Sequence, residues 1–162
     1  TKQYYLNLDG KKLDQAGMRK MYQKWIQKYS LVSIEDPFEE DGWAAWSAFT
    51  KEAGRNIMVV GEDLFVTNEV RLAEGIKNGA GNAIIIKPNQ VGTLTEATAA
   101  CIMAKSHGYK VIVSHRSGET TDDFIADFAV AVGAEFIKSG APCRGERIAK
   151  YNRLIEIESE LV

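Results

Sequence analysis

The sequence predicts an α/β protein, a partial TIM-type (β/α)8 barrel with about five parallel strands and flanking helices. Three observations predict it: a strand–helix unit recurs at regular spacing, the strands do not alternate apolar with polar residues, and each ends near a charged residue. Short non-alternating apolar runs are typical of strands covered on both faces of a parallel sheet. The predicted strands are Leu31–Ile34, Ile57–Val60, Ala83–Ile86, Lys110–Val113 and Glu135–Lys138.

Apolar residues at helical spacing flank these strands and predict six amphipathic helices. The helices are Asp14–Tyr29, Trp43–Gly54, Glu69–Gly79, Thr93–His107, Asp122–Val132 and Arg144–Glu160. Thr67–Asn68 precedes a helix and offers suitable capping side chains, and Gly54 and Gly108 follow helices, as C-terminal glycines often do. We expect His107 to close its helix as a C-terminal cap. Three tryptophans at helical spacing are expected to be packing residues: Trp25, Trp43 and Trp46.

The predicted strands start 26, 26, 27 and 25 residues apart. Such regularity fits either an open doubly wound sheet or a barrel with right-handed crossovers. A dinucleotide-binding sheet would have a glycine-rich loop after its first strand, and Ser33–Pro37 is not one. A complete barrel usually needs about 250 residues. With 162 residues, we expect residues 1–162 to form one incomplete barrel without a second domain.

Composition excludes several classes of protein. The net charge of -2 argues against a nucleic-acid-binding protein, which usually carries a basic face. No apolar run approaches the length of a membrane span, and the polar, aromatic segment Thr1–Asp14 does not resemble a signal peptide. We expect Cys101 and Cys143 to be reduced thiols in a cytoplasmic protein.

A titratable residue stands at or just after the end of every predicted strand. These residues are Glu35, Glu62, Lys87, His115 and Lys138. In a parallel barrel the carboxyl ends of the strands meet on one side, where the functional sites of this fold lie. Pro37, Pro88 and Pro142 lie in the loops that follow, and proline stiffens a loop. The sequence therefore predicts a preorganised site at this end.

The residue types indicate the chemistry of that site. Glu35 and Glu62, with Asp36 and Asp63 beside them, offer the hard oxygen ligands that Mg²⁺ prefers. Positive charge around Lys87 favours its neutral amine, the form that can act as a general base. The segment Ser114–Thr120 combines hydroxyls with a guanidinium and leads into a helix N-terminus, a combination suited to phosphate. The predicted ligand is a phosphorylated, carboxylated metabolite.

The same residues lie in a series of motifs that resembles the enolases. The motifs are Ser33–Phe38, Gly61–Asn68, Lys87–Gln90, Ser114–Thr120, Ile137–Pro142 and Arg147–Asn152. The resemblance runs from about Tyr4 to Leu161. It implies a cytoplasmic, Mg²⁺-dependent lyase of glycolysis and gluconeogenesis, phosphopyruvate hydratase, which reversibly dehydrates 2-phosphoglycerate to phosphoenolpyruvate.

The resemblance also implies a role for each site residue. Lys87 matches the base that abstracts the substrate's α-proton, and Glu35 a ligand of the tighter of two Mg²⁺ ions. Arg116 and Ser117 match contacts to the substrate phosphate. His115 matches an active-site residue near the substrate. Lys138 matches a cation on the substrate carboxylate.

The chain departs from the enolase pattern at one ligand and in extent. Glu62 stands where the family usually has an aspartate ligand. The family's N-terminal domain, its first barrel strands, a third metal aspartate expected just before Thr1, and the glutamate that helps the hydroxyl leave are absent. We therefore expect the isolated chain to be inactive, and to form a homo-oligomer or pair with the missing N-terminal part.

Three alternatives remain. A sugar-acid dehydratase or racemase on a similar barrel would have no use for the phosphate-binding segment Ser114–Thr120. A non-catalytic fold fragment or binding module would not need the full set of site residues. A degenerate homologue is suggested by Glu62 alone.

Overall fold

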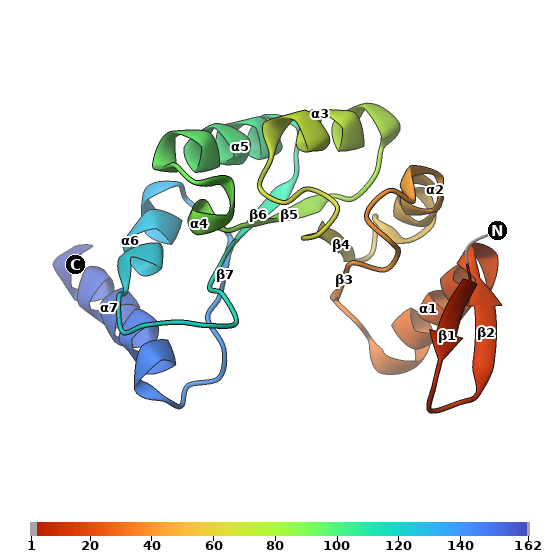
Figure 1. The fold of residues 1–162 in the computed structure, drawn as a ribbon. Coiled ribbons are helices and arrows are strands. Elements are labelled where there is room, and N and C mark those ends of the chain that lie inside the picture. Colours follow the sequence, from red (N-terminus) through yellow and green to blue (C-terminus); the bar gives the residue numbers. More distant parts are fainter. Residues whose placement is uncertain (1–2, 162) are drawn as a thin grey trace.

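A computed structural model describes residues 3–161, so Thr1, Lys2 and Val162 of the predicted 1–162 unit lie outside the described residues. The strands are β1 (Gln3–Leu6), β2 (Lys11–Asp14), β3 (Ser33–Glu35), β4 (Met58–Gly61), β5 (Ala83–Ile86), β6 (Lys110–Ser114) and β7 (Phe136–Lys138). The helices are α1 (Gln15–Tyr29), α2 (Trp43–Ala53), α3 (Glu69–Asn78), α4 (Pro88–Val91), α5 (Leu94–Ser106), α6 (Phe124–Ala131) and α7 (Gly145–Leu161). The ribbon forms an arch with the helices outside and the larger sheet inside (Figure 1).

The predicted half-barrel is confirmed by the order of the strands. The larger sheet has five strands in the order β3-β4-β5-β6-β7, and every neighbouring pair is parallel. Each strand thus lies beside its predecessor in sequence, and the order never reverses as it would in a doubly wound sheet. All five carboxyl ends therefore lie at one edge of the arch.

Successive residues of the central strands face opposite sides of the sheet and enter two separate apolar clusters. Val59, Ile84 and Val113 belong to the larger cluster, which includes buried residues of the outer helices. Val60 and Ile85 belong to a small cluster on the other face. Burial on both faces explains why the strands lack polar alternation in the sequence.

The two edge strands differ from this expectation. The middle residue of β3 and of β7 is half-buried and its neighbours are exposed, whereas all four residues of β5 are buried. Phe136 keeps 46% of its surface exposed. An edge strand has a sheet neighbour on one side only, so apolar composition alone overestimates its burial.

All six predicted helices are present, and their ends agree with the predicted caps. The side chains of Asp14, Asn68 and Thr93 accept hydrogen bonds from backbone N–H groups of the first turns of α1, α3 and α5. His107 is the C-cap of α5, as predicted. Gly79 ends α3 at a φ of 64°, a left-handed conformation that favours glycine.

A hairpin and a short helix were not predicted. An antiparallel hairpin of β1 and β2 precedes the barrel repeat, and its turn places Gly10 at a φ of 62°. The Asp9-Gly10 pair is a recognisable hairpin turn, but four-residue strands give too short an alternation to detect. The loop after β5 folds into the short helix α4, with Pro88 in its first turn.

The expected packing of the tryptophans holds only in part. Trp46 is fully buried, at 0% exposure, and Trp43 is half-buried against the core. Trp25 is 42% exposed and packs through an edge contact of its ring with Tyr22. It belongs to α1, which lies with the β1–β2 hairpin at one end of the arch (Figure 1). Both cysteines are free thiols, as expected. No helix within residues 3–161 is long and apolar enough to cross a membrane.

The two tryptophans give a test of this packing. Replacing Trp46 by alanine should lower the free energy of unfolding by about 3–5 kcal/mol, because it leaves a cavity in the core. The matched change Trp25→Ala should cost less than about 1 kcal/mol. Urea denaturation followed by circular dichroism measures both, and equal losses would contradict the burial described here.

Candidate active site

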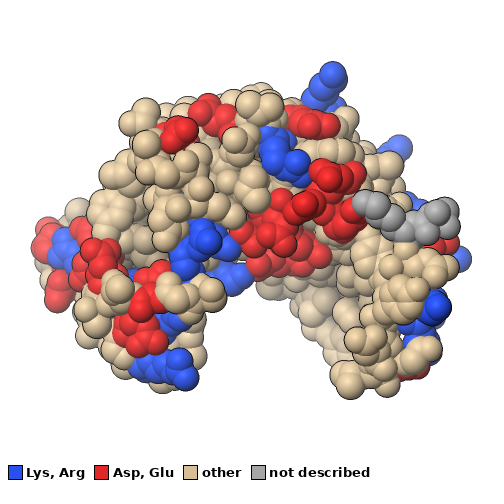
Figure 2. All heavy atoms as spheres, viewed as in Figure 1, with Lys and Arg blue, Asp and Glu red and all other residues tan. Residues whose placement is uncertain are grey.

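The structure brings the predicted site residues to the carboxyl edge of the sheet. Glu35 and Lys138 are the last residues of β3 and β7, and Glu62, Lys87 and His115 directly follow β4, β5 and β6. Figure 2 shows acidic side chains gathered on the concave side of the arch, with basic side chains next to them. Parallel strands in sequential order place these positions side by side.

Three carboxylates converge at the ends of β3 and β4. Glu35, Asp36 and Glu62 each offer an oxygen, and these oxygens all lie within 4.8 Å of one another. Asp63, the fourth acid considered from the sequence, lies outside this group. Three converging carboxylates are hard oxygen donors of the kind that Mg²⁺ takes. The residues present therefore fit a divalent cation of this type.

Asp36 joins the two acidic loops. Its carboxylate accepts hydrogen bonds from the backbone N–H groups of Glu62, at 2.9 Å, and Asp63, at 3.1 Å. Its backbone has a φ of 42°, an uncommon conformation for a residue other than glycine. Burial raises the pKa of Asp36 above its usual value, although the two hydrogen bonds oppose this rise.

Two lysines form ion pairs with the predicted metal ligands. Lys87 Nζ lies 2.6 Å from Glu62 Oε1. Lys138 Nζ lies 2.7 and 2.8 Å from the two carboxylate oxygens of Glu35. Burial raises the pKa of Glu62, but the hydrogen bond and charge of Lys87 outweigh it, so the pKa lies below its usual value. The expected positive surroundings of Lys87 are therefore offset by a carboxylate.

A polar network supports the pair of Lys87 and Glu62. Gln90 Nε2 lies 3.4 Å from Glu62 Oε1. Thr67 Oγ1 accepts a hydrogen bond from the backbone N–H of Lys87 at 2.9 Å and donates to Gln90 Oε1 at 3.3 Å. Thr67 is fully buried, at 0% exposure. This network fixes the loops after β4 and β5 relative to each other.

The segment Ser114–Thr120 is tied to α7 through a buried lysine. Glu119 Oε1 accepts a hydrogen bond from the backbone N–H of Arg116 at 2.8 Å. Lys150 Nζ donates to Glu119 Oε2 at 2.9 Å and to the carbonyl oxygens of Thr120 and Glu146. Lys150 is only 1% exposed, so this contact is shielded from water. Glu119 thereby joins the two ends of the segment, and Lys150 fixes the segment to α7.

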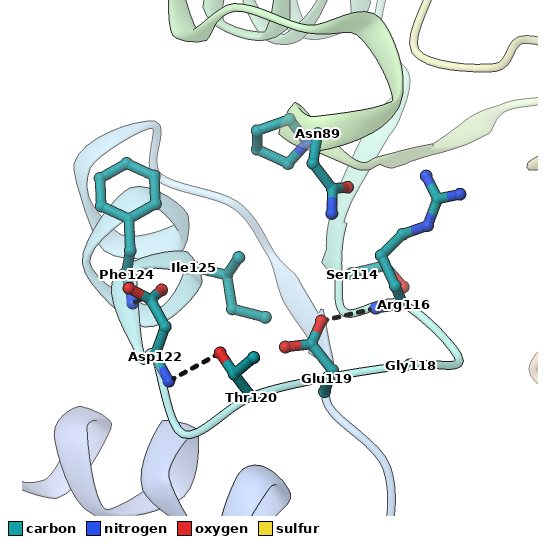
Figure 3. A pocket seen from close by; sticks show the side chains of 10 residues that line it. Asn89, Ser114, Arg116, Gly118, Glu119, Thr120, Asp122, Phe124 and Ile125 are labelled. Atoms are coloured by element: carbon teal, nitrogen blue, oxygen red, sulfur yellow. Dashed lines mark hydrogen bonds between the residues drawn. The ribbon is translucent and has the colours of Figure 1, made fainter.

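An open cavity of about 670 Å³ lies beside this loop. It lies between the loop, α4 and the start of α6, and its lining includes Asn89, Ser114, Arg116, Glu119 and Phe124. Figure 3 shows the guanidinium of Arg116 extended away from Glu119. The side-chain donors of Arg116 are thus directed away from the carboxylate that holds its backbone, which suits them to an external anion.

Arg147 of α7 holds the first part of the same loop. Its guanidinium donates to the carbonyl oxygens of Arg116 and Ser117, at 2.9 Å each, and hydrogen-bonds to His115 Nδ1. The predicted residues thus form two linked groups. In one group, the ion pairs Glu35–Lys138 and Glu62–Lys87 meet where their carboxylates converge. In the other, Arg147 binds His115, Arg116 and Ser117. A hydrogen bond of 2.9 Å from His115 N to Lys138 O connects the groups.

The sequence did not reveal the supporting residues Thr67, Gln90, Arg147 and Lys150. Thr67 and Gln90 lie in quoted motifs but carry no charge that would attract attention. Arg147 and Lys150 stand three residues apart on α7, and thus on one helix face. That spacing was the available indication, but it did not show which loop this face contacts.

Residues 1–162 match the enolase C-terminal TIM barrel domain family. The chain belongs to the enolase family. It is 55% identical over 151 residues to an enolase of Elusimicrobium minutum, covering 93% of this chain and 36% of that protein. It is 52% identical over 158 residues to an enolase of Helicobacter pylori strain Shi470, and 49% identical over 158 residues to enolase 1 of Methanospirillum hungatei. Both matches cover 98% of this chain and 37% of the relative.

This enolase-family chain therefore spans a little over a third of the length of those relatives. The family match confirms the predicted membership and the barrel type of the fold. The roles that the resemblance implied for Glu35, Glu62, Lys87, His115, Arg116, Ser117 and Lys138 stay predictions.

The buried contact of Lys150 predicts a measurable loss of stability. Lys150→Met should lower the free energy of unfolding by about 3 kcal/mol, because it leaves the Glu119 carboxylate without its cation in a shielded place. The matched change Lys110→Met, at the exposed pair with Glu135, should cost less than about 1 kcal/mol.

The pH dependence of stability should change in the same variant. Burial raises the pKa of Glu119, but hydrogen bonds from Arg116 and Lys150 outweigh it and lower the pKa. A lowered pKa stabilises the fold above the ordinary carboxyl pKa, and this stability is lost as the pH falls through the lowered value. Urea denaturation from about pH 5 to about pH 3 should show a smaller loss in Lys150→Met than in wild type. An identical decline in both proteins would contradict the assignment.

Proposed function

We propose that this chain supplies the base, the substrate-binding cations and part of the metal site of an enolase, a lyase that reversibly dehydrates 2-phosphoglycerate to phosphoenolpyruvate in glycolysis and gluconeogenesis. The observation that carries the proposal is the convergence of Glu35, Asp36 and Glu62 with Lys87 and Lys138 at one edge of a half-barrel of this family. The substrate carries a carboxylate and a phosphate, and the chain offers separate cationic groups for each.

Glu35 and Glu62 would hold Mg²⁺, and Asp36 lies close enough to take part. When bound, the ion supplies Lewis-acid stabilisation of negative charge on the substrate carboxylate. Lys138 carries a fixed positive charge next to Glu35 and would bind the same carboxylate. Asp36 would also keep Glu62 in place through the backbone hydrogen bond described above.

Lys87 would accept the α-proton of the substrate at Nζ in its neutral form. Its amine lies against Glu62 and its backbone is fixed by Thr67, so the side chain starts from a defined position. A positioned general base contributes roughly 10²–10⁴-fold to a rate. The network of Thr67 and Gln90 would preserve that position during turnover.

Arg116 and Ser117 would bind the substrate phosphate, and Arg116 lines the cavity beside α4. A guanidinium suits phosphate because it offers paired donors in a plane. The backbone of both residues is clamped by Arg147, and the guanidinium of Arg116 extends away from its own loop (Figure 3). The binding groups are thus held by a rigid frame.

The chain would not complete this reaction by itself. The acid that helps the hydroxyl leave, and a third metal carboxylate, would come from the remainder of an enolase, which spans the larger part of its relatives. The strands β3 and β7 end the larger sheet and have one partner each among the described residues. We propose that they pair with the remainder of the barrel or with a second copy, in the cytoplasm.

Metal binding can be tested on the chain itself. Isothermal titration calorimetry with MgCl₂ should show binding, and Glu35→Gln should weaken it at least about tenfold, since a hard anionic ligand is lost. Glu158→Gln, the same loss of charge at an exposed position of α7, should leave the affinity unchanged. Equal affinities in all three proteins would remove Glu35 from the site.

Activity can be tested with the chain and with a chimera. The isolated chain with MgCl₂ and 2-phosphoglycerate should form no phosphoenolpyruvate. A chimera in which residues 1–162 replace the matching part of the Helicobacter pylori enolase should be active. In that chimera Lys87→Ala should lower kcat by about 10³-fold or more, whereas Lys110→Ala, at the opposite end of the strands, should not. Turnover by the isolated chain would show that the remainder is dispensable. A folded but inactive chimera would favour a non-catalytic role.

A further inference from the structure

His115 and Arg147 form a contact in which only one of the two side chains can donate. Arg147 Nη1 hydrogen-bonds to His115 Nδ1. A guanidinium carries five N–H donors and no acceptor. Nδ1 must therefore be the acceptor and carry a lone pair. A histidine with an unprotonated Nδ1 is neutral, and its single ring proton is on Nε2.

The guanidinium of Arg147 cannot easily turn away from this contact. Its two donations to the carbonyl oxygens of Arg116 and Ser117 fix its plane, and its side chain is only 13% exposed. The residues that follow β7 pack against the pair. A Cβ placed on Gly140 would lie 3.1 Å from Arg147 Cδ and 3.3 Å from His115 Cε1. The glycine therefore allows both side chains to approach the backbone closely.

The charges around His115 favour the same neutral form. Arg147 and Lys150 face it from α7, Lys138 faces it from β7, and Glu119 is the opposing acid on its own loop. Burial and the charge of Arg147 lower the pKa of His115, with smaller contributions from Lys138 and Lys150. Glu119 acts in the other direction, but its carboxylate is already paired with Lys150 at 2.9 Å. Three cations therefore outweigh one carboxylate.

The other ring nitrogen is available to a ligand. Among residues 3–161, no hydrogen bond to His115 Nε2 is formed, and this atom is not one of the buried polar atoms without a partner. It is thus open to solvent at the carboxyl end of β6. With its proton fixed there, the imidazole presents one N–H donor and no acceptor at that position.

We propose that Arg147 is a positioning residue that holds His115 as a neutral imidazole protonated on Nε2, so that the ring presents a fixed N–H donor to an anionic oxygen of the ligand. The predicted contact between His115 and the ligand rests on the proposed function, whereas the predicted protonation state of His115 does not. In this arrangement His115 does not accept a proton through Nδ1 while Arg147 is in place. It acts as a hydrogen-bond donor beside Arg116 and Ser117.

The second histidine of the chain provides an internal reference. His107 Nδ1 lies 2.9 Å from the carbonyl oxygen of Met103 and 3.1 Å from Ser106 Oγ. The Ser106 hydroxyl donates its own proton to the same carbonyl, at 2.8 Å, and so can only accept from Nδ1. A carbonyl oxygen only accepts, so this Nδ1 carries a proton. The sequence has 2 histidines, and the structure thus assigns them opposite states at Nδ1.

The test is long-range ¹H–¹⁵N correlation spectroscopy of the 162-residue chain labelled with ¹⁵N-histidine, from about pH 5 to about pH 8. His115 should show an unprotonated Nδ1 and a protonated Nε2 at neutral pH, and should titrate below the ordinary histidine value. His107 should show a protonated Nδ1. Arg147→Met should allow both tautomers of His115 and raise its titration midpoint towards the ordinary value.

Two further variants separate this effect from loss of structure. Gly140→Ala keeps every charge but crowds the pair, and should mix the tautomers of His115 without unfolding the chain. Arg153→Met removes a different arginine of α7, one paired with Asp127, and should leave the His115 spectrum unchanged. Circular dichroism checks that each variant is folded.

Three results would overturn the proposal: a protonated Nδ1 on His115 in the wild-type chain, a titration at or above the ordinary histidine value, or an unchanged spectrum in folded Arg147→Met. The spectra require no substrate, metal or turnover. A failure of the proposed enolase activity would therefore leave this result standing, and a failure of the protonation state would leave the activity to be judged by its own assay.

Discussion

The site depends on the curl of the parallel sheet, which brings the ends of its two edge strands within reach of each other. β3 and β7 are separated by four strand intervals in the sheet, which in a flat sheet would be about 19 Å at roughly 4.8 Å for each interval. The side chains of Lys138 and Glu35 together reach about 10 Å from their backbones, yet they form an ion pair at 2.7 Å. Only a sheet bent into an arch allows this. The same bend places Glu62 and Lys87 between the two edges, so one constraint gathers residues that span most of the chain.

The outer layer of helices has a second role beyond covering the sheet. α7 is the last helix of the chain, and its inner face carries Arg147 and Lys150, which bind the loop that follows β6. Lys150 is buried, and a buried ammonium is tolerated only when its donors are satisfied, as they are here by Glu119 and two carbonyl oxygens. The loop that carries the predicted phosphate contacts is therefore shaped by a helix about thirty residues further along the chain, rather than by its own sequence.

This division explains how much could be predicted from the sequence. The repeat of strands and helices could be predicted because burial on two faces and helical spacing both show in residues close together in the sequence. The ends of the predicted strands then gave the positions of the site residues. The partners of those residues are not local. Lys87 was expected in positive surroundings, and instead Lys87 pairs with Glu62 and Lys138 with Glu35. These pairings depend on the positions of four different loops, which no local pattern contains. The β1–β2 hairpin and the exposure of Trp25 also depend on what lies at the end of the arch, which apolar spacing does not describe.

Backbone conformation adds a constraint that residue types alone do not reveal. Val66 and Thr67 have φ angles of 45° and 59°, and a left-handed conformation is unfavourable for β-branched residues, at about 1–3 kcal/mol each. The surrounding contacts maintain it: the Thr67 hydroxyl binds the backbone of Lys87 and the side chain of Gln90, and Gln90 in turn binds Glu62. A relaxed loop after β4 would move Thr67 away from Lys87 and loosen the pair with Glu62. The strained residues thus lie where the carboxylate of Glu62 and the amine of Lys87 must be kept in contact. The buried packing of the half-barrel stabilises this conformation.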